Sequence, residues 1–166
     1  MLITNEIFRN TNEIYPRTIE LTTRTNAEYL SELDAQGMQI RDWTRDNMLL
    51  ALIPLEKSEV VNLVVCSVAD LGLQDSVTLK QIYAKADELG LRLCDPHVGP
   101  EMRLAFKDQL VDSYYNIAME PIIKSDGRAV VWDVAHDSGK LWLDRRGGDE
   151  NGLWNSNQVF VFSSRK

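Results

Sequence analysis

Alternating and helical patterns of hydrophobic residues divide this chain into a helix-rich first part and a strand-rich last part. Residues 17–23 alternate, with Ile19 and Leu21 between polar neighbours, and this pattern predicts a half-buried strand. Residues 60–66 are apolar almost without alternation and rich in β-branched side chains. Such a run predicts a central strand that is buried on both faces.

Two helices are predicted by their end signals as well as by their apolar stripes. Each is preceded by a threonine, Thr25 or Thr78, that stands three residues before a glutamate or glutamine and can form a capping box. Each is followed by a glycine, Gly37 or Gly90, which suits the left-handed position after a helix. A third, less regular helix is expected over residues 41–53, where Pro54 would end it.

From residue 114 onward the hydrophobic period changes to two, which predicts an antiparallel sheet. Asp-Gly at 126–127 and Ser-Gly at 138–139 are turn signals for hairpins between successive strands. A glycine-rich loop is expected over residues 144–157. The expected strands cover residues 115–123, 128–135, 140–143 and 158–163.

These elements predict an α+β fold in which a helical and mixed N-terminal half packs on a C-terminal antiparallel β-meander. Residues 1–16 are polar and aperiodic, and we interpret them as an arm. Residues 17–166 are expected to form one domain, helix-rich over 17–93 and with its sheet over 114–166.

Composition adds an uneven acidity to this picture. The net charge is −7. Residues 1–90 hold 8 basic and 14 acidic residues, whereas residues 91–166 hold 10 and 11. Acidic surfaces repel phosphate backbones, so nucleic-acid binding is disfavoured and docking on a basic protein is favoured.

Cysteine usage and the N-terminus favour a cytoplasmic protein. Cys66 and Cys94 form neither a CxxC pair nor a disulfide framework. The first residues lack the basic and apolar regions of a signal peptide, and no segment has the roughly 20 apolar residues that cross a bilayer.

The two histidines, His97 and His136, are candidate catalytic or metal-binding residues. His136 and Asp137 end a predicted strand beside Asp133, and imidazole with carboxylates is typical of metal sites. On a regular strand, however, Asp133 and Asp137 share one face while His136 points to the other, so we predict no metal site there. No phosphate loop and no nucleophile elbow is found in the sequence, and we predict no cofactor.

The segment of residues 94–103 is the first candidate for a binding site. Two prolines and a glycine restrict its backbone, so that His97, Glu101 and Arg103 would be displayed with little conformational freedom. A simple turn from the helices into the sheet is the structural alternative. Arg145 and Arg146 are a second candidate, because they precede two glycines in a loop that could contact an anion or a partner.

The order of elements over residues 67–106 also fits helix–turn–helix–wing, which suggests DNA binding. The polar face of the helix after Thr78 carries Lys80 and Lys85 but also Asp87 and Glu88. The charge of this face therefore disfavours a recognition helix.

Several short motifs occur in a fixed order: LGLRLC at 89–94, VGP at 98–100, IAMEPI at 117–122, LWLD at 141–144 and FVF at 160–162. In this layout the chain resembles a family of small uncharacterised bacterial proteins. The resemblance implies a self-contained bacterial domain and supplies no catalytic residues.

Together these observations predict a non-catalytic, cytoplasmic interaction or regulatory protein whose partner is another protein. The first alternative is a small enzyme or ligand-binding protein that uses His97 or His136. The second is a winged-helix-like DNA-binding protein.

Overall fold

A computed structural model describes residues 17–49 and 51–164 of the chain. The arm expected for residues 1–16 lies outside the described residues. The elements in chain order are β1 (Arg17–Leu21), α1 (Asn26–Ala35), β2 (Gln39–Ile40), the π-helical turn η1 (Thr44–Met48), β3 (Glu59–Ser67), the 3-10 turn η2 (Ala69–Leu71), β4 (Val77–Thr78), α2 (Leu79–Glu88), β5 (Leu91–Arg92), α3 (Val98–Ala105), β6 (Ser113–Ile117), β7 (Ile122–Ile123), β8 (Ala129–Asp137), β9 (Lys140–Gly147), β10 (Leu153–Trp154) and β11 (Val159–Ser164).

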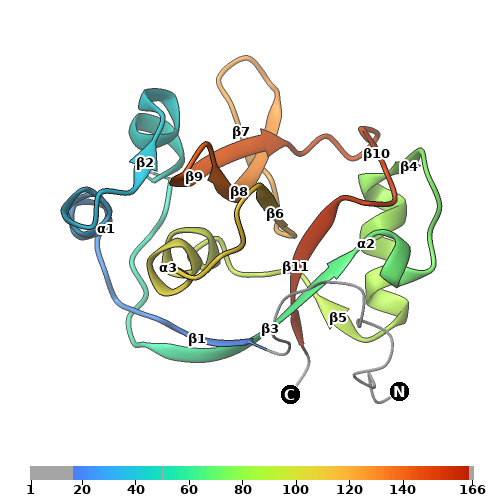
Figure 1. The fold of residues 1–166 in the computed structure, drawn as a ribbon, viewed down its shortest axis with the longest axis horizontal. Helices are drawn as coiled ribbons and strands as arrows, with labels where there is room; N and C mark the ends of the chain where they lie inside the picture. Colours follow the sequence, from blue (N-terminus) through green and yellow to red (C-terminus); the bar gives the residue numbers. More distant parts are fainter. Residues whose placement is uncertain (1–16, 50, 165–166) are drawn as a thin grey trace.

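Most of the described strands form one curled mixed sheet in the order β1-β3-β11-β6-β8-β9-β2 (Figure 1). β5 adds to β11 and β7 to β8, while β10 and β4 form a separate pair. β11 pairs with β6 in parallel and so does β2 with β9, whereas the other pairs are antiparallel. The mixed α+β class is confirmed. The expected division into a helical half and a separate meander is not observed, because β1 and β3 belong to the same sheet as β11.

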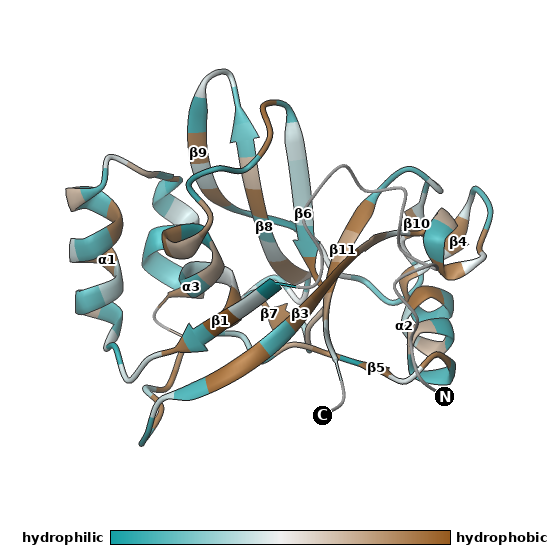
Figure 2. Cartoon of the chain, turned by 60° about the horizontal axis from the view of Figure 1, so that its bottom comes forward, coloured by the Kyte–Doolittle hydropathy of each residue, from teal (hydrophilic) through white to brown (hydrophobic). Residues whose placement is uncertain are grey.

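Hydrophobic side chains fill both sides of the middle of this sheet. On β3, Leu63 and Val65 belong to one buried cluster, while Val64 and Cys66 belong to the other. The expectation that this strand is buried on both faces is therefore confirmed. α1 and α3 lie on one side and α2 on the other, as Figures 1 and 2 show.

β11 follows the same alternation. Phe160 and Phe162 pack with α2, and Val161 packs in the cluster that contains residues of α1 and α3. α2 covers the sheet where β3 and β11 lie, and its buried residues join the cluster of Phe160. The same side of β6, β8 and β9, farther from α2, carries polar residues, and the candidate site lies there.

The predicted helix starts are confirmed. Thr25 accepts a hydrogen bond from the backbone of Glu28, whose side chain returns to Thr25, and Thr78 and Gln81 form the same capping box on α2. These reciprocal bonds satisfy backbone groups that the first turn of a helix leaves open. The helix expected over residues 41–53 is only partly formed, since it becomes the π-helical turn η1.

The two predicted hairpin turns are also present. Gly127 and Gly139 have φ angles of +85° and +73°, which side chains larger than hydrogen rarely adopt. Gly139 lies in the turn between β8 and β9, which pair from Asp137 and Lys140 beside the turn to Val130 and Gly147. The loop expected over residues 144–157 is shorter than predicted, because β9 continues to Gly147 and β10 lies within the remainder.

Among the described residues, no helix combines the length and the hydrophobicity that are needed to cross a membrane.

Candidate functional site

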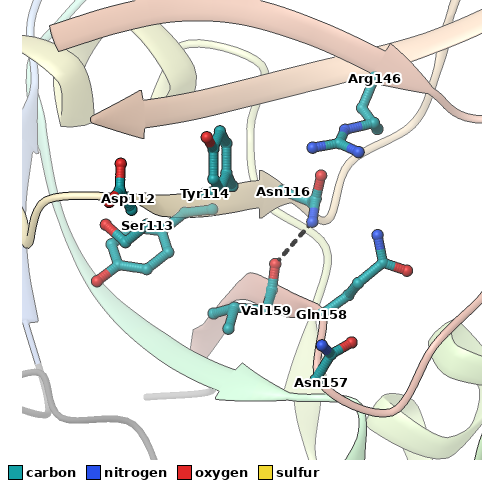
Figure 3. Close-up of a pocket in the computed structure, with 9 residues that line it drawn as sticks. Asp112, Ser113, Tyr114, Asn116, Arg146, Asn157, Gln158 and Val159 are labelled. Carbon is teal, nitrogen blue, oxygen red and sulfur yellow. Dashed lines mark hydrogen bonds between the residues drawn. The ribbon is translucent and has the colours of Figure 1, made fainter. Parts of the chain in front are cut away.

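A polar depression of about 360 Å³ lies where β11 begins beside β6 (Figure 3). It forms at this point because the parallel pairing of β6 with β11 starts only at Tyr115 and Val159. We call it the amide groove, after the side-chain amides in its wall. Its lining consists of Asp112, Ser113, Tyr114, Tyr115, Asn116, Arg146, Asn157, Gln158 and Val159.

Asn116 is held in one orientation at the centre of the amide groove. Its Nδ2 donates a hydrogen bond of 2.9 Å to the carbonyl oxygen of Val159. Because the nitrogen is committed to this bond, Oδ1 is left as the acceptor. Only 2% of the residue is exposed, and Oδ1 has no hydrogen-bond partner within the described part of the chain. A buried acceptor without a donor is costly, so this oxygen is a place where a ligand donor would be favoured.

Hydrogen-bond donors lie beside this acceptor. Gln158 uses Oε1 to accept a bond of 2.9 Å from the backbone of Asn155, which leaves its NH₂ group as a donor. In Figure 3 this group points toward the side of the groove where Asn116 and Arg146 lie. The amide groove therefore offers an acceptor and donors close together, as a polypeptide backbone does.

A second depression of about 280 Å³ extends the amide groove and shares Arg146 and Gln158 with it. Each depression has one exposed aromatic or apolar side chain in its wall. Tyr114 is 38% exposed in the amide groove, and Leu153 is 69% exposed in the second depression. A bound segment that covered these side chains would remove apolar surface from water, in addition to the hydrogen bonds of the groove.

Arg146 separates the two depressions and is the single cation among their described lining residues. Its Nη2 lies 3.4 Å from Oδ2 of the buried Asp133 on β8. Burial raises the pKa of Asp133 to about 6, although Arg146 opposes the shift. A carboxylate with a raised pKa beside a pocket is a common property of functional sites.

The first sequence-predicted candidates lie elsewhere, in the core. The segment that was expected to display them as a loop forms α3 instead, and His97, Glu101 and Arg103 are each less than 5% exposed. Pro100 fits because the first turn of a helix does not use its N–H group. A binding role for these residues stays a prediction.

Glu101 on α3 contacts the connection between β1 and α1. Its Oε1 receives a 2.6 Å bond from Arg24, and its Oε2 receives a 2.6 Å bond from the backbone of Thr22. Both partners lie between β1 and α1. The contacts therefore tie the β1–α1 connection to α3.

Arg103 is fully buried without a carboxylate partner among the described residues. Its guanidinium donates to Oε1 of Gln109 at 2.6 Å and to the carbonyl oxygens of Ala135 and Phe106 at 2.9 and 2.5 Å. Burial lowers the pKa of Arg103 to about 10. These contacts give Arg103 a structural role between α3 and β8.

His97 pairs with a carboxylate, as expected for the enzymatic alternative. Its Nδ1 lies 2.7 Å from Oδ1 of Asp95, and this bond lowers the pKa of Asp95. The imidazole packs 6.1 Å from the ring of Tyr29 between centroids. Nε2 of His97 is buried without a hydrogen-bond partner in the described chain. The amide groove, the second depression and the two depressions beside α2 are lined by other side chains.

His136 and Asp137 do not meet at a common site. Nδ1 of His136 lies 2.7 Å from the carbonyl oxygen of Gln109, whereas the carboxylate of Asp137 accepts hydrogen bonds from Tyr114 and Ser138. In residues 17–49 and 51–164, no group of three or more His, Cys, Asp and Glu side chains is arranged to hold a metal ion.

Arg145 and Arg146 point to opposite sides of β9. The guanidinium of Arg145 lies 4.2 Å from the centroid of the Trp43 ring, beside Lys124 at 5.0 Å. Arg146 faces the amide groove. The adjacent arginines therefore do not form a joint anion site, and Arg146 alone belongs to the candidate site.

Sequence reasoning missed the amides of the site. The only local signal is Asn116, a polar residue between apolar ones on β6, which is typical of a position with a specific partner. Gln158 lies beside Asn116 through the parallel pairing of β11 with β6, which has no local signature, and Arg146 lies there through the antiparallel pairing of β8 with both β6 and β9.

Comparisons of the chain with protein-family models, with curated proteins and with solved structures returned no match.

Proposed function

We propose that this chain is a non-catalytic, cytoplasmic interaction protein of a bacterial cell that binds an extended segment of a partner protein in the amide groove. The observation that carries the proposal is the buried Asn116, whose Oδ1 has no hydrogen-bond partner in the described chain and lines a groove with the donors Gln158 and Arg146. Peptide N–H and C=O groups match this arrangement of one acceptor and several donors.

The charges around the groove favour a basic partner. Asp112 is exposed in the lining of the groove, and Asp149 is exposed in the lining of the second depression. Asp133 lies beneath the groove, against the single arginine Arg146. The chain as a whole has a net charge of −7. A segment with lysine or arginine would therefore be attracted at long range and would bind less tightly at high salt.

Two free, buried thiols support the cytoplasmic assignment. Cys66 and Cys94 are unpaired, as is usual in reducing compartments.

The DNA-binding alternative is less well supported by the surface of α2. Lys85 forms an ion pair with Glu88 at 3.3 Å. Lys80 borders a pocket that also holds Glu120 and Glu150. Phosphate groups would meet these carboxylates as well as the lysines.

The enzymatic alternative is supported by the pairing of Asp95 with His97. The imidazole is 4% exposed, so a substrate could reach Nε2 only after a rearrangement of α1 or α3. Asn116 is also buried, but it lines the wall of a surface groove together with the partly exposed Gln158 and Arg146, and we therefore prefer the binding function.

A selection from a random-peptide display library tests the proposal. We expect enriched peptides that share a sequence pattern, carry net positive charge and bind with a Kd on the order of 10 μM. Gln158→Ala and Arg146→Ala should each weaken binding about 5- to 10-fold through lost hydrogen bonds. Arg128→Ala is the matched control, since Arg128 is 80% exposed in the turn between β7 and β8. Enriched peptides that bind the groove variants as tightly as the unaltered protein would refute the proposal.

A further inference from the structure

Two unsatisfied oxygen atoms lie beneath the amide groove on neighbouring strands. Asn116 on β6 is directly opposite Asp133 on β8 in the antiparallel register, so their side chains project from the same face of the sheet. Asp133 is 5% exposed. Oδ1 of Asn116 and Oδ1 of Asp133 are both buried without a hydrogen-bond partner in the described part of the chain.

The contact with Arg146 does not satisfy Asp133. At 3.4 Å it is longer than the 2.7–2.9 Å of a strong charge-assisted hydrogen bond, and it uses Oδ2 alone. Burial raises the pKa of Asp133 to about 6, and repulsion by the carboxylate of Asp144 on β9 adds to this shift. Asp133 also interacts electrostatically with the hydroxyl of Tyr114 on β6 and contributes to the raised pKa of that tyrosine. Near neutral pH the carboxylate is therefore charged, buried and poorly compensated.

A donor that satisfies both oxygens must be compact, must carry several N–H groups and should be positive. A primary ammonium has three N–H donors at the end of a thin aliphatic stem, whereas a guanidinium is a wide planar fork. The carboxylates of Asp112 in the groove and of Asp149 in the second depression attract the same charge. A lysine stem is long enough to reach below a groove floor while its backbone stays in the groove.

We propose that Asn116 and Asp133 form the seat for a lysine side-chain ammonium of the partner segment, with its three N–H groups shared between the two side-chain oxygens and the groove. This inference rests on the proposed function and names the residue that the partner must present. Arg146 is 40% exposed, so it can turn away from Asp133 and bond a carbonyl of the partner when the lysine enters.

Calorimetric titration with one lysine-containing peptide from the display selection tests the seat. The peptide is compared with a version in which norleucine replaces the lysine, which removes the ammonium and keeps the stem. We expect the replacement to weaken binding about 30-fold or more for the unaltered protein and about 3-fold or less for Asp133→Asn. Because the norleucine peptide needs no protein variant, this half of the test does not depend on the folding of a mutant.

Asp112→Asn is the matched control for the protein side. It removes one carboxylate from the same groove but leaves the seat intact, so the 30-fold effect of norleucine should persist. Lowering the pH from 7.5 to 5 should weaken lysine-peptide binding to the unaltered protein, because Asp133 takes up a proton, and should leave Asp133→Asn nearly unaffected.

The outcomes separate the two proposals. The lysine seat would be overturned if the selected peptides contained no lysine. It would also be overturned if norleucine weakened binding equally for the unaltered protein and for Asp133→Asn. Neither result would overturn binding in the groove. Acetylation of the peptide N-terminus tests whether the terminal ammonium occupies the site instead. If acetylation weakens binding to the unaltered protein but not to Asp133→Asn, and norleucine has no such effect, the lysine seat is overturned. Peptides that bind outside the groove would overturn the proposed function itself.

Discussion

Asn116 and Asp133 lie opposite each other on β6 and β8, and each has one buried side-chain oxygen without a hydrogen-bond partner among the described residues. Burial of such groups opposes folding, because the oxygens lose water and gain nothing in return. Binding sites often contain groups of this kind, which cost stability in the free protein and are satisfied by the ligand. The pair therefore links the stability of the fold to the proposed function.

The first prediction concerns Asp133→Asn and stability. Folding raises the pKa of this carboxyl from its ordinary 3.8 to about 6, so the folded state holds the proton more tightly than the unfolded state. The contribution of Asp133 to the free energy of unfolding therefore falls as the pH rises from about 4 to about 6 and stays low above that. We expect Asp133→Asn to be about 1–2 kcal/mol more stable at pH 8, and the difference to shrink at pH 4.

Urea denaturation of both proteins at pH 4, 6 and 8 measures this difference. Asp126→Asn is the control, because the pKa of Asp126 is lowered by the backbone N–H of Arg128. Asp126→Asn should have the opposite effect and lower the free energy of unfolding at pH 8. Equal stability of Asp133→Asn and the unaltered protein at all three pH values would contradict the buried, poorly compensated carboxylate.

A second prediction concerns Glu101, which accepts two bonds of 2.6 Å from Arg24 and from the backbone of Thr22. Glu101→Gln keeps the shape but removes the charge and places an NH₂ group where one oxygen accepted. We expect a loss of about 2–3 kcal/mol in the free energy of unfolding.

The exposed ion pair of Asp34 with Arg45 is the comparison for Glu101. Its distance of 2.7 Å is nearly the same, but the Asp34 side chain is 51% exposed. Solvent screens such pairs, and Asp34→Asn should cost only a few tenths of a kcal/mol. Similar losses for the two variants would show that Glu101 is not the buried tie between the β1–α1 connection and α3.

The third prediction concerns the buried guanidinium of Arg103. Lysine can keep the charge at this position, but it cannot donate in the directions of both Gln109 and the carbonyls of Ala135 and Phe106. Arg103→Lys should lower the free energy of unfolding by about 2–4 kcal/mol, measured by thermal and urea denaturation. A loss below about 0.5 kcal/mol would show that charge alone matters there.

A fourth prediction concerns the contact between α3 and β8. A Cβ atom on Gly99 would overlap the indole of Trp132, whose Nε1 donates to the carbonyl oxygen of Pro96 at 2.8 Å. Gly99→Ala should therefore cost about 3 kcal/mol, although alanine is usually better than glycine in a helix. Gly147→Ala is the control, because a Cβ there meets no atom within 4 Å, and it should be tolerated. A stabilised Gly99→Ala would contradict the close packing.

The sequence predicted the elements whose signals are local. Both capping boxes, the central strand β3, and the hairpin at Gly139 depend on residues that are near one another in the chain.

Two other features could not be read from local signals. Pro96 and Pro100 suggested a rigid loop, but prolines are equally compatible with the start of a helix, and only packing on Trp132 decides between them. The candidate site depends on β11 lying parallel to β6, which joins Asn116 to Val159 across 43 residues of chain. The side-chain amides therefore looked like ordinary polar residues in the sequence.

The central claim is that the amide groove binds a partner segment. The most direct measurement is a titration of ¹⁵N-labelled protein with a display-selected peptide, followed through the side-chain NH₂ signals of Asn116, Asn157 and Gln158. We predict that these signals shift together and saturate with the Kd found by calorimetry, while the backbone signals of α2 stay in place. Shifts on α2 with unmoved amide signals in the groove would contradict the account.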